Sequence, residues 1–362
     1  MRNANTMMII DLFKVFVPAI LAFTIGIGIT PILTHYLYKY RVWKKTPGKT
    51  ALDGQAAVEF GKLRAETETK TPRMGGIVIW ASVLLSTAGL WLVAQIFPHQ
   101  VTSKLDFLSR SQTWIPLVTL LLGAFVGLIN DVRDITDYKG NRGMPLSLRL
   151  LFVAALSFFI GWWFYAKLDV NAVGIPFSGN LTIGWLIIPL FMLVSIFLYA
   201  SGVIDGIDGL SGGVFASVFA AYAFIAFNQH QINLAAFCAA VVGALLAFLW
   251  FNVPPARFWM TETGSMGLTL TIAAVAFMTD TLGDGKGLSA LPIIAFLLVA
   301  TVLSNIIQVA SKKLRNGKRV FRIAPLHHHF EAKGWSGAKV TMRYWILSIM
   351  FAIVGVSLAL IS

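Results

Sequence analysis

Charged residues are scarce in this sequence. They make up 12% of its 362 residues, whereas hydrophobic residues make up 57% and the mean hydropathy is +0.75. A soluble core could not bury that much apolar surface, so the composition excludes an ordinary water-soluble protein and favours a polytopic membrane protein. Cysteine is nearly absent as well. Cys238 is the single one, which excludes an intrachain disulfide and leaves the redox compartment open.

A cleavable signal peptide is also lacking. The first apolar segment is long enough to cross a bilayer and is followed by a basic loop, so we expect a retained helix. Apolar windows of about 20 residues predict an all-α polytopic membrane protein, with one integral-membrane domain over residues 1–362. The ten predicted transmembrane helices are 13–38, 75–97, 114–129, 149–167, 183–200, 210–228, 234–251, 266–282, 289–310 and 342–361.

Acidic residues are fewer than basic ones, 16 against 29. Because 23 of the 29 basic residues fall in one alternate set of loops, the positive-inside rule places this set in the cytoplasm and both termini outside. The basic charges lie between spans, which argues against a nucleic-acid partner. The external side carries a predicted small β-hairpin near 170–182. The cytoplasmic set comprises 39–74, 130–149, 201–209, 252–265 and 311–343.

The third of these loops holds two aspartates three residues apart, Asp205 and Asp208, interleaved with glycines. On a helical turn this spacing puts both carboxylates on one side, and Gly206 lets a ligand or a backbone come close. Mg²⁺ prefers such oxygen ligands and shares them with substrate phosphates. The alternative is that the aspartates cap a helix that begins near Leu210. Ionisable groups at membrane depth favour the functional interpretation.

Three consecutive histidines, His327 to His329, stand out in a chain with six histidines. Successive side chains point in different directions, so they do not form the single face of a zinc site. Imidazoles beside many cations are better suited to phosphate or pyrophosphate. The segment 250–265 adds the lone acid Glu262 and aromatic rings that suit either a nucleobase or an interfacial belt.

Two further polar segments belong to the cytoplasmic set. The segment 70–76 combines basic side chains with a glycine pair, which suits phosphate contact and equally suits membrane anchoring. Asn130 and Asp131 directly follow a predicted span. We therefore expect the Asp131 carboxylate at a span end, where it need not be buried.

Together these motifs resemble the phospho-N-acetylmuramoyl-pentapeptide transferases, a branch of the polyprenyl-phosphate N-acetylhexosamine-1-phosphate transferase superfamily. The resemblance covers nearly the whole chain, and the histidine motif together with Lys333-Gly334-Trp335 is specific to the muramoyl branch. It implies ten transmembrane helices with both ends outside, in agreement with the hydropathy count. The segments that carry it are Pro72–Gly76, Asp205–Leu210, Phe248–Asn252 and Ala324–Glu331.

The resemblance implies a reaction in the bacterial inner membrane. Phospho-MurNAc-pentapeptide moves from UDP-MurNAc-pentapeptide to undecaprenyl phosphate, with Mg²⁺ as cofactor and with UMP and lipid I as products. Such a transfer needs positioning and charge neutralisation more than covalent machinery. A homodimer is left open. The site residues implied by similarity are Asp205 and Asp208 at the metal and nucleotide, Gly206 and Ile207 in the uridine pocket, Trp259 over uracil, Asn252 nearby, Lys70 at the nucleotide, Asp131 as a catalytic residue, and His327, His328 and His329 at the phosphates.

At several positions of this site the chain departs from the family pattern. The family's principal Mg²⁺ ligand is an aspartate after a glycine, and Thr261-Glu262 takes its place here. We expect Glu262, which is one methylene longer, to take over the metal-ligand role beside Asp205 and Asp208. The other departures are Asn130 for an aspartate, and Tyr199 and Gly202 for asparagines.

These departures keep two other interpretations open. The chain could transfer a different UDP-sugar phosphate to a polyprenyl phosphate, although the motif from His327 to Trp335 disfavours this. It could also be a catalytically silent paralogue that binds polyprenyl phosphate or nucleotide. A transporter is disfavoured because the polar groups gather on one side of the membrane and not at mid-depth between inverted repeats.

Overall fold

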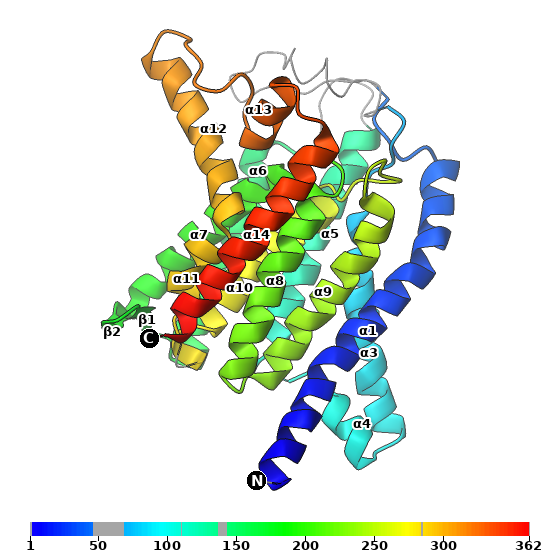
Figure 1. Cartoon of the computed structure of the whole chain (residues 1–362), viewed down its shortest axis with the longest axis vertical. Helices are drawn as coiled ribbons and strands as arrows, with labels where there is room; N and C mark the ends of the chain where they lie inside the picture. Colours follow the sequence, from blue (N-terminus) through cyan, green and yellow to red (C-terminus); the bar gives the residue numbers. More distant parts are fainter. Residues whose placement is uncertain (1, 46–68, 110, 137–142, 284, 362) are drawn as a thin grey trace.

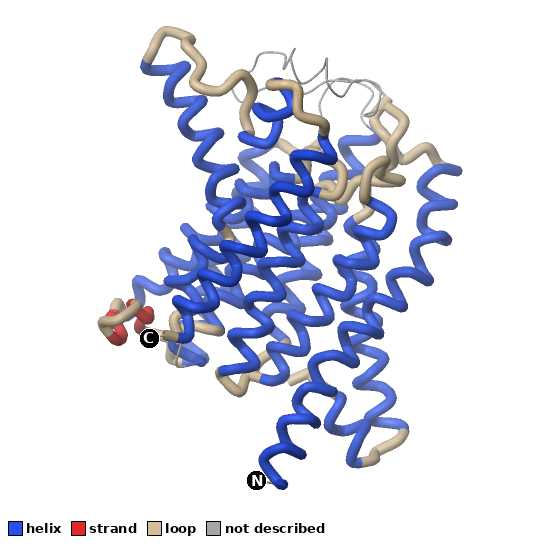
Figure 2. Tube along the Cα trace, in the orientation of Figure 1, coloured by secondary structure: helices blue, strands red, loops and turns tan. Residues whose placement is uncertain are grey.

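The computed structural model describes residues 2–45, 69–109, 111–136, 143–283 and 285–361, and most of them lie in helices joined by loops (Figures 1 and 2). The helices, including the 3₁₀ turns η1 to η3, are α1 (Arg2–Lys39), α3 (Gly76–Ile96), α4 (Gln100–Leu105), α5 (Trp114–Thr136), α6 (Leu146–Leu168), η1 (Gly184–Leu186), α7 (Ile187–Ser201), η2 (Gly202–Ile204), α8 (Leu210–Asn228), α9 (Ile232–Asn252), α10 (Glu262–Met278), η3 (Thr281–Gly283), α11 (Gly287–Ile294), α12 (Phe296–Leu314), α13 (Leu326–Ala332) and α14 (Gly337–Leu360). The strands are β1 (Ala172–Ile175) and β2 (Gly179–Thr182).

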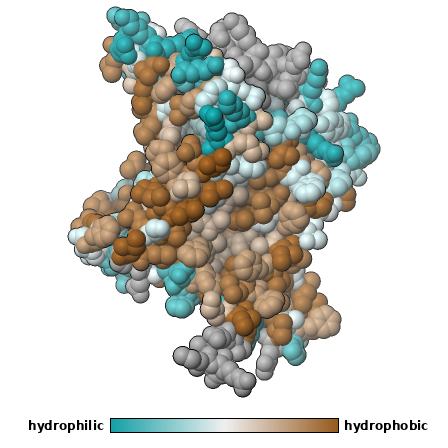
Figure 3. Space-filling model, in the orientation of Figure 1, coloured by the Kyte–Doolittle hydropathy of each residue, from teal (hydrophilic) through white to brown (hydrophobic). Residues whose placement is uncertain are grey.

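The predicted all-α polytopic architecture is confirmed. Within the described residues, nine helices are long and apolar enough to cross a membrane, and the 17-residue α10 is a shorter apolar helix. Each of the ten predicted spans coincides with one of these. Figure 3 shows apolar residues in a broad band around the middle of the molecule, as expected for a surface that meets lipid.

One predicted span, 289–310, is divided in two. α11 ends at Ile294 and α12 begins at Phe296, with a turn at Ala295 between them. Pro292 lies inside α11. Proline lacks an N–H and crowds the carbonyl of the turn before it, so Pro292 acts on the start of α11 and does not explain the turn at Ala295, which follows it. Hydropathy alone does not register this interruption.

The centre of the bundle is built around α10, in which every residue from Thr263 to Met278 is buried. Its neighbour α5 approaches closely because glycines face it. A side chain at Gly127 would collide with the backbone of Glu262, and one at Gly123 would collide with Gly267. Small residues are the usual means by which membrane helices pack at short distance. This packing fixes the start of α10 against the end of α5.

The two ends of the bundle differ. Both chain termini and the two-stranded antiparallel sheet lie toward the lower end in Figure 1, and we call this the hairpin end. The sheet confirms the predicted hairpin. The opposite end, which we call the loop end, carries α13 and the turns 202–209 and 252–261 (Figure 1). Of the predicted cytoplasmic loops, residues 46–68 and 137–142 lie outside the described residues.

The expectation for Asp131 was wrong. The predicted span ends at residue 129, but α5 continues to Thr136 and holds Asn130 and Asp131 within it. Asp131 is only 1% exposed and Asn130 only 7%. The helix continues because the start of α10 packs against it and supplies hydrogen-bond donors to the buried carboxylate, as described below. Hydropathy marks where apolar side chains end, and a helix with such partners can extend further.

Candidate functional site

The turn 205–209 connects η2 to α8 at the loop end and carries Asp205 and Asp208. The predicted helical geometry is absent here, because the backbone forms successive turns instead of a helix. Gly209 closes the segment with φ +75° and stands at the N-cap of α8. That left-handed conformation is one that glycine adopts without strain. The two aspartates are therefore placed by a turn, and each carboxylate takes its own direction.

Both carboxylates accept hydrogen bonds from the segment 252–261, which lies between α9 and α10. Asp205 accepts hydrogen bonds from Ser211 Oγ at 2.7 Å and from the Thr261 amide at 2.8 Å. Asp208 accepts from the Ala256 amide and from the Trp259 indole, each at 3.0 Å. Since the N-cap of α8 is Gly209, the alternative that these aspartates cap that helix is wrong.

The buried side chain of Asn252 connects the same two segments by hydrogen bonds. It is 2% exposed. Its Oδ1 accepts from the Gly209 amide at 2.9 Å, and its Nδ2 donates to the Phe258 carbonyl at 2.7 Å. A buried amide with both groups bonded to backbone fixes the relative position of two loops. Ile207 is also inside, 5% exposed and part of the main apolar core.

Two of the three histidines face the turn 205–209. His327 and His328, on α13, are 0% and 3% exposed. The Nε2 atoms of both rings lie 2.7 Å from the position that a Cβ on Gly206 would occupy. Gly206 is therefore required by the close approach of the imidazoles. On its other nitrogen, Nδ1, His328 is 2.7 Å from Glu331 Oε2.

His329 points elsewhere. Its Nδ1 accepts a hydrogen bond from the Arg322 amide at 3.1 Å, and its ring packs edge-on against Phe321. Burial, followed by the charges of Lys333 and Arg322, lowers the pKa of His329 below its usual value. The neutral form that accepts this hydrogen bond is thus the favoured one. The histidine run therefore has two parts. His327 and His328 face Gly206, whereas His329 accepts a hydrogen bond from the segment that precedes α13.

Asp131 caps the start of α10. Its Oδ2 accepts from Thr261 Oγ1 at 2.5 Å, Thr263 N at 2.9 Å and Thr263 Oγ1 at 2.6 Å. Thr261 has φ +55°, an unusual conformation for a β-branched residue and one that suits the glycine of the family pattern. Because its amide also donates to Asp205, Thr261 links the two carboxylates.

Glu262, the first residue of α10, forms an ion pair with Arg149 of α6. Arg149 Nη1 donates to Glu262 Oε1 at 2.7 Å, and the two side chains are 23% and 27% exposed. Asn130, where the family has an aspartate, accepts from the Met144 amide at 2.9 Å and so holds the segment before α6. Arg149 was missed in the sequence, where its only signal was a basic residue at the start of a span.

Segment 70–76 packs the start of α3 against its neighbours. Arg73 pairs with Asp134, and a side chain at Gly75 or Gly76 would collide with residues 258–264. Gly75 and Gly76 donate to the carbonyls of Trp259 and Met260 at 2.8 and 3.1 Å. Lys70 is exposed at the beginning of this segment. The glycine pair therefore brings the start of α3 against the loop that carries Thr261.

The predicted metal ligands do not assemble as a trio. Among the described residues, no group of three histidine, cysteine or acidic side chains is placed to hold a metal ion. Asp205 and Asp208 turn toward segment 256–261, and Glu262 turns toward Arg149. Mg²⁺ usually takes one or two protein carboxylates together with substrate phosphates, so Glu262 with Asp131 or Asp205 beside it fits that donor set.

Comparison with known proteins shows the family of this chain. Residues 113–280 match Glycosyl transferase family 4, and together with the apolar helices this match indicates a transferase of the membrane. It is 36% identical over 308 residues to the phospho-N-acetylmuramoyl-pentapeptide-transferase of Geobacillus thermodenitrificans, covering 84% of this chain and 88% of that protein. With the proteins of that name from Anoxybacillus flavithermus and Bacillus mycoides it shares 34% identity over 93% and 94% of its length, and 95% and 96% of theirs. The chain belongs to the phospho-N-acetylmuramoyl-pentapeptide transferase family and is an enzyme.

Proposed function

We propose that this chain catalyses the Mg²⁺-dependent transfer of phospho-MurNAc-pentapeptide from UDP-MurNAc-pentapeptide to undecaprenyl phosphate. In this reaction a phosphate oxygen of the lipid attacks the sugar-linked phosphorus of the nucleotide. The bond to the UMP oxygen breaks, and lipid I and UMP are the products. The observation that supports the proposal most strongly is the convergence of turn 205–209, segment 252–262 and the His327–His328 pair at one end of the bundle.

The residues of this cluster suit separate parts of the substrate. The imidazoles of His327 and His328 lie beside the acidic turn, where they could contact phosphate oxygens. Trp259 is held by its hydrogen bond to Asp208 and offers a ring for the uracil base. When bound, Mg²⁺ would neutralise charge on the diphosphate, with Glu262 as the protein ligand that we expect to matter most.

Turnover by the purified chain in detergent, with UDP-MurNAc-pentapeptide and undecaprenyl phosphate, tests the proposal. We expect lipid I and UMP in equal amounts and only when Mg²⁺ is present. Product from another UDP-sugar, and none from UDP-MurNAc-pentapeptide, would replace the proposed donor. Tight UMP binding without turnover would support the silent paralogue, an alternative that the Glu262–Arg149 ion pair favours because it engages the carboxylate.

We also propose that the loop end faces the cytoplasm of a bacterial inner membrane and that both termini face outward. The charge distribution supports this orientation. Single cysteines at Lys318, exposed at the loop end, and at Phe177, exposed on the hairpin, should be labelled from opposite sides of intact cells. Labelling of both from outside would exclude it. Lys139, another basic position of the predicted set, lies outside the described residues.

A further inference from the structure

Three helix ends meet around Glu262. It is the first residue of α10, Arg149 lies in the first turn of α6, and Tyr199 lies in the last turn of α7. Arg149 Nη1 donates to Glu262 Oε1 at 2.7 Å, and Tyr199, which is 7% exposed, interacts electrostatically with both residues.

The surroundings of Glu262 are acidic. Asp131 and Asp205 both act on its carboxylate electrostatically, and the positive charges of Arg149 and Arg73 oppose them. Arg73 is already paired with Asp134. Arg149 is therefore the cation that balances Glu262. A divalent cation placed at the same carboxylate would be repelled by this guanidinium, since like charges at short range disfavour each other.

The guanidinium also retains an unused donor. Nε of Arg149 is buried and has no hydrogen-bond partner in the described part of the chain. Buried polar groups are normally hydrogen-bonded, and an orphaned donor needs an explanation. Arginine presents its donors as a planar fork that matches phosphate oxygens. A phosphate near the loop end would satisfy Nε and would offer Arg149 a partner other than Glu262.

We propose that Arg149 is a positioning residue that competes with the divalent cation for Glu262 and turns to a substrate phosphate when the site is filled. The proposal rests on the proposed function and deepens it. In the substrate-free protein the Arg149–Glu262 pair closes the carboxylate. Arrival of the diphosphate gives Arg149 a second anion, and Glu262 is then released for the metal. Metal and nucleotide should consequently bind with positive coupling.

Mn²⁺ binding to the purified full-length chain in detergent tests this directly, with free Mn²⁺ followed by electron paramagnetic resonance and without nucleotide. Arg149→Gln should bind Mn²⁺ about five- to tenfold more tightly than the natural chain, because the competing charge is gone. Arg149→Lys keeps the charge and should change binding by less than about threefold. The matched control is Arg133→Gln, which removes one exposed charge from the end of α5 and should leave Mn²⁺ affinity unchanged.

A second measurement reports the other half of the proposal. With Mn²⁺ near saturation, Arg149→Gln should weaken UMP binding by about tenfold, since a charge-assisted contact to phosphate is lost. Opposite shifts for metal and nucleotide in one variant are not expected from a merely structural residue. Glu262→Gln should cancel the Mn²⁺ effect of the arginine change in the double variant.

Unchanged or weakened Mn²⁺ binding by folded Arg149→Gln would overturn the proposal, and so would an equal shift in Arg133→Gln. If Arg149→Gln does not fold, as judged by thermal unfolding, unchanged UMP binding by Arg149→Lys overturns it, because lysine lacks the fork. The outcome is separable from the proposed function. Absence of turnover with intact Mn²⁺ competition rejects only the reaction, whereas turnover without competition rejects only the role of Arg149.

Discussion

A buried aspartate lies near each end of α10, and the two aspartates have different surroundings. At the hairpin end Asp280, 2% exposed, accepts from the Gly174 amide at 2.6 Å and the Leu288 amide at 2.9 Å. It ties β1 to the start of α11. At the loop end Asp131 gathers three donors on one oxygen, and beside it lie two more carboxylates and an arginine. Hydrogen bonds to a buried aspartate therefore join β1 to α11 at the hairpin end, and at the loop end they hold a carboxylate within a cluster of charged side chains.

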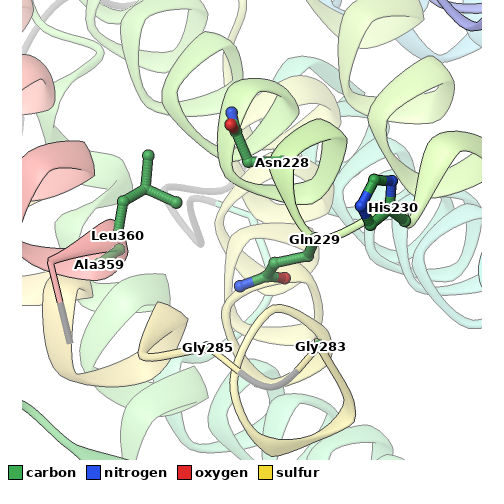
Figure 4. Close-up of a pocket in the computed structure, with 7 residues that line it drawn as sticks. All are labelled: Asn228, Gln229, His230, Gly283, Gly285, Ala359 and Leu360. Carbon is green, nitrogen blue, oxygen red and sulfur yellow. The ribbon is translucent and has the colours of Figure 1, made fainter. Parts of the chain in front are cut away.

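The difference extends to the cavities. The hairpin end has a cavity of about 320 Å³ in which Gln229 points toward the segment with Gly283 and Gly285 (Figure 4). His230 is the one titratable side chain among its described lining residues. A hollow with so little charge offers no catalytic groups, whereas the loop end brings acids, imidazoles and guanidinium together. The concentration of ionisable groups, more than the presence of a cavity, is the reason for proposing the active site at the loop end.

Glu262→Gln should produce the largest effect and should be confined to the loop end. We expect turnover to fall by about 1,000-fold and Mg²⁺-dependent UMP binding to disappear, because a neutral amide oxygen is a much weaker Mg²⁺ ligand than a carboxylate. Glu262→Asp should also weaken turnover and Mg²⁺-dependent UMP binding, because the side chain is one methylene shorter. The loss should be smaller than in Glu262→Gln because the carboxylate is kept. Radiolabelled transfer and calorimetric UMP titration would measure this. Unaltered Mg²⁺-dependent binding in Glu262→Gln would mean that another residue holds the metal.

His328→Ala should come next, with turnover per folded molecule lower by about 10- to 100-fold, the value of a charge-assisted phosphate contact. The folded yield in detergent should fall much less. His35→Ala, which removes an exposed imidazole from α1, is the control and should retain full turnover. A loss of yield or melting temperature with normal activity per folded molecule would instead assign His328 to packing.

Asp280→Asn should show the reverse pattern at the hairpin end. The asparagine amide cannot accept both backbone hydrogen bonds, and one buried donor left without an acceptor costs about 1–3 kcal/mol. The melting temperature should therefore fall, while turnover of the folded fraction stays within about twofold of the natural chain. A large loss of turnover with unchanged stability would show that the two ends are coupled and would break the comparison drawn here.

The pH dependence contributed by His329 should be the smallest effect. Because its pKa is lowered, the folded chain favours neutral His329, so its contribution to stability is complete above about pH 6.5 and decreases as the pH falls through the lowered value. Protonation removes the acceptor for the Arg322 amide. Turnover should drop a few-fold as the pH falls through that lowered pKa, and His329→Gln should flatten the drop. An identical pH profile in the variant would assign the drop to another group.

The helices follow from local properties, and local properties are readable in the sequence. Runs of apolar residues longer than about 20 positions leave few alternatives to a membrane helix, and turn residues mark the small hairpin. The glycine at 206 could be recognised as a point of close approach. What approaches it, the pair His327 and His328, lies far along the chain, and only the packing of α13 reveals it.

The sequence by itself determined the class of protein, the spans, the hairpin and the residues that share one end, since apolar runs and loop charges are properties of neighbouring positions. Tertiary structure alone decided how those residues are used. It buried Asp131 under Thr261 and Thr263, set Asn252 between two loops, and paired Arg149 with Glu262 across 113 positions of chain. Hydrogen bonds and ion pairs depend on distances of about 3 Å, and no local pattern fixes such distances between helices that meet only when the bundle has packed.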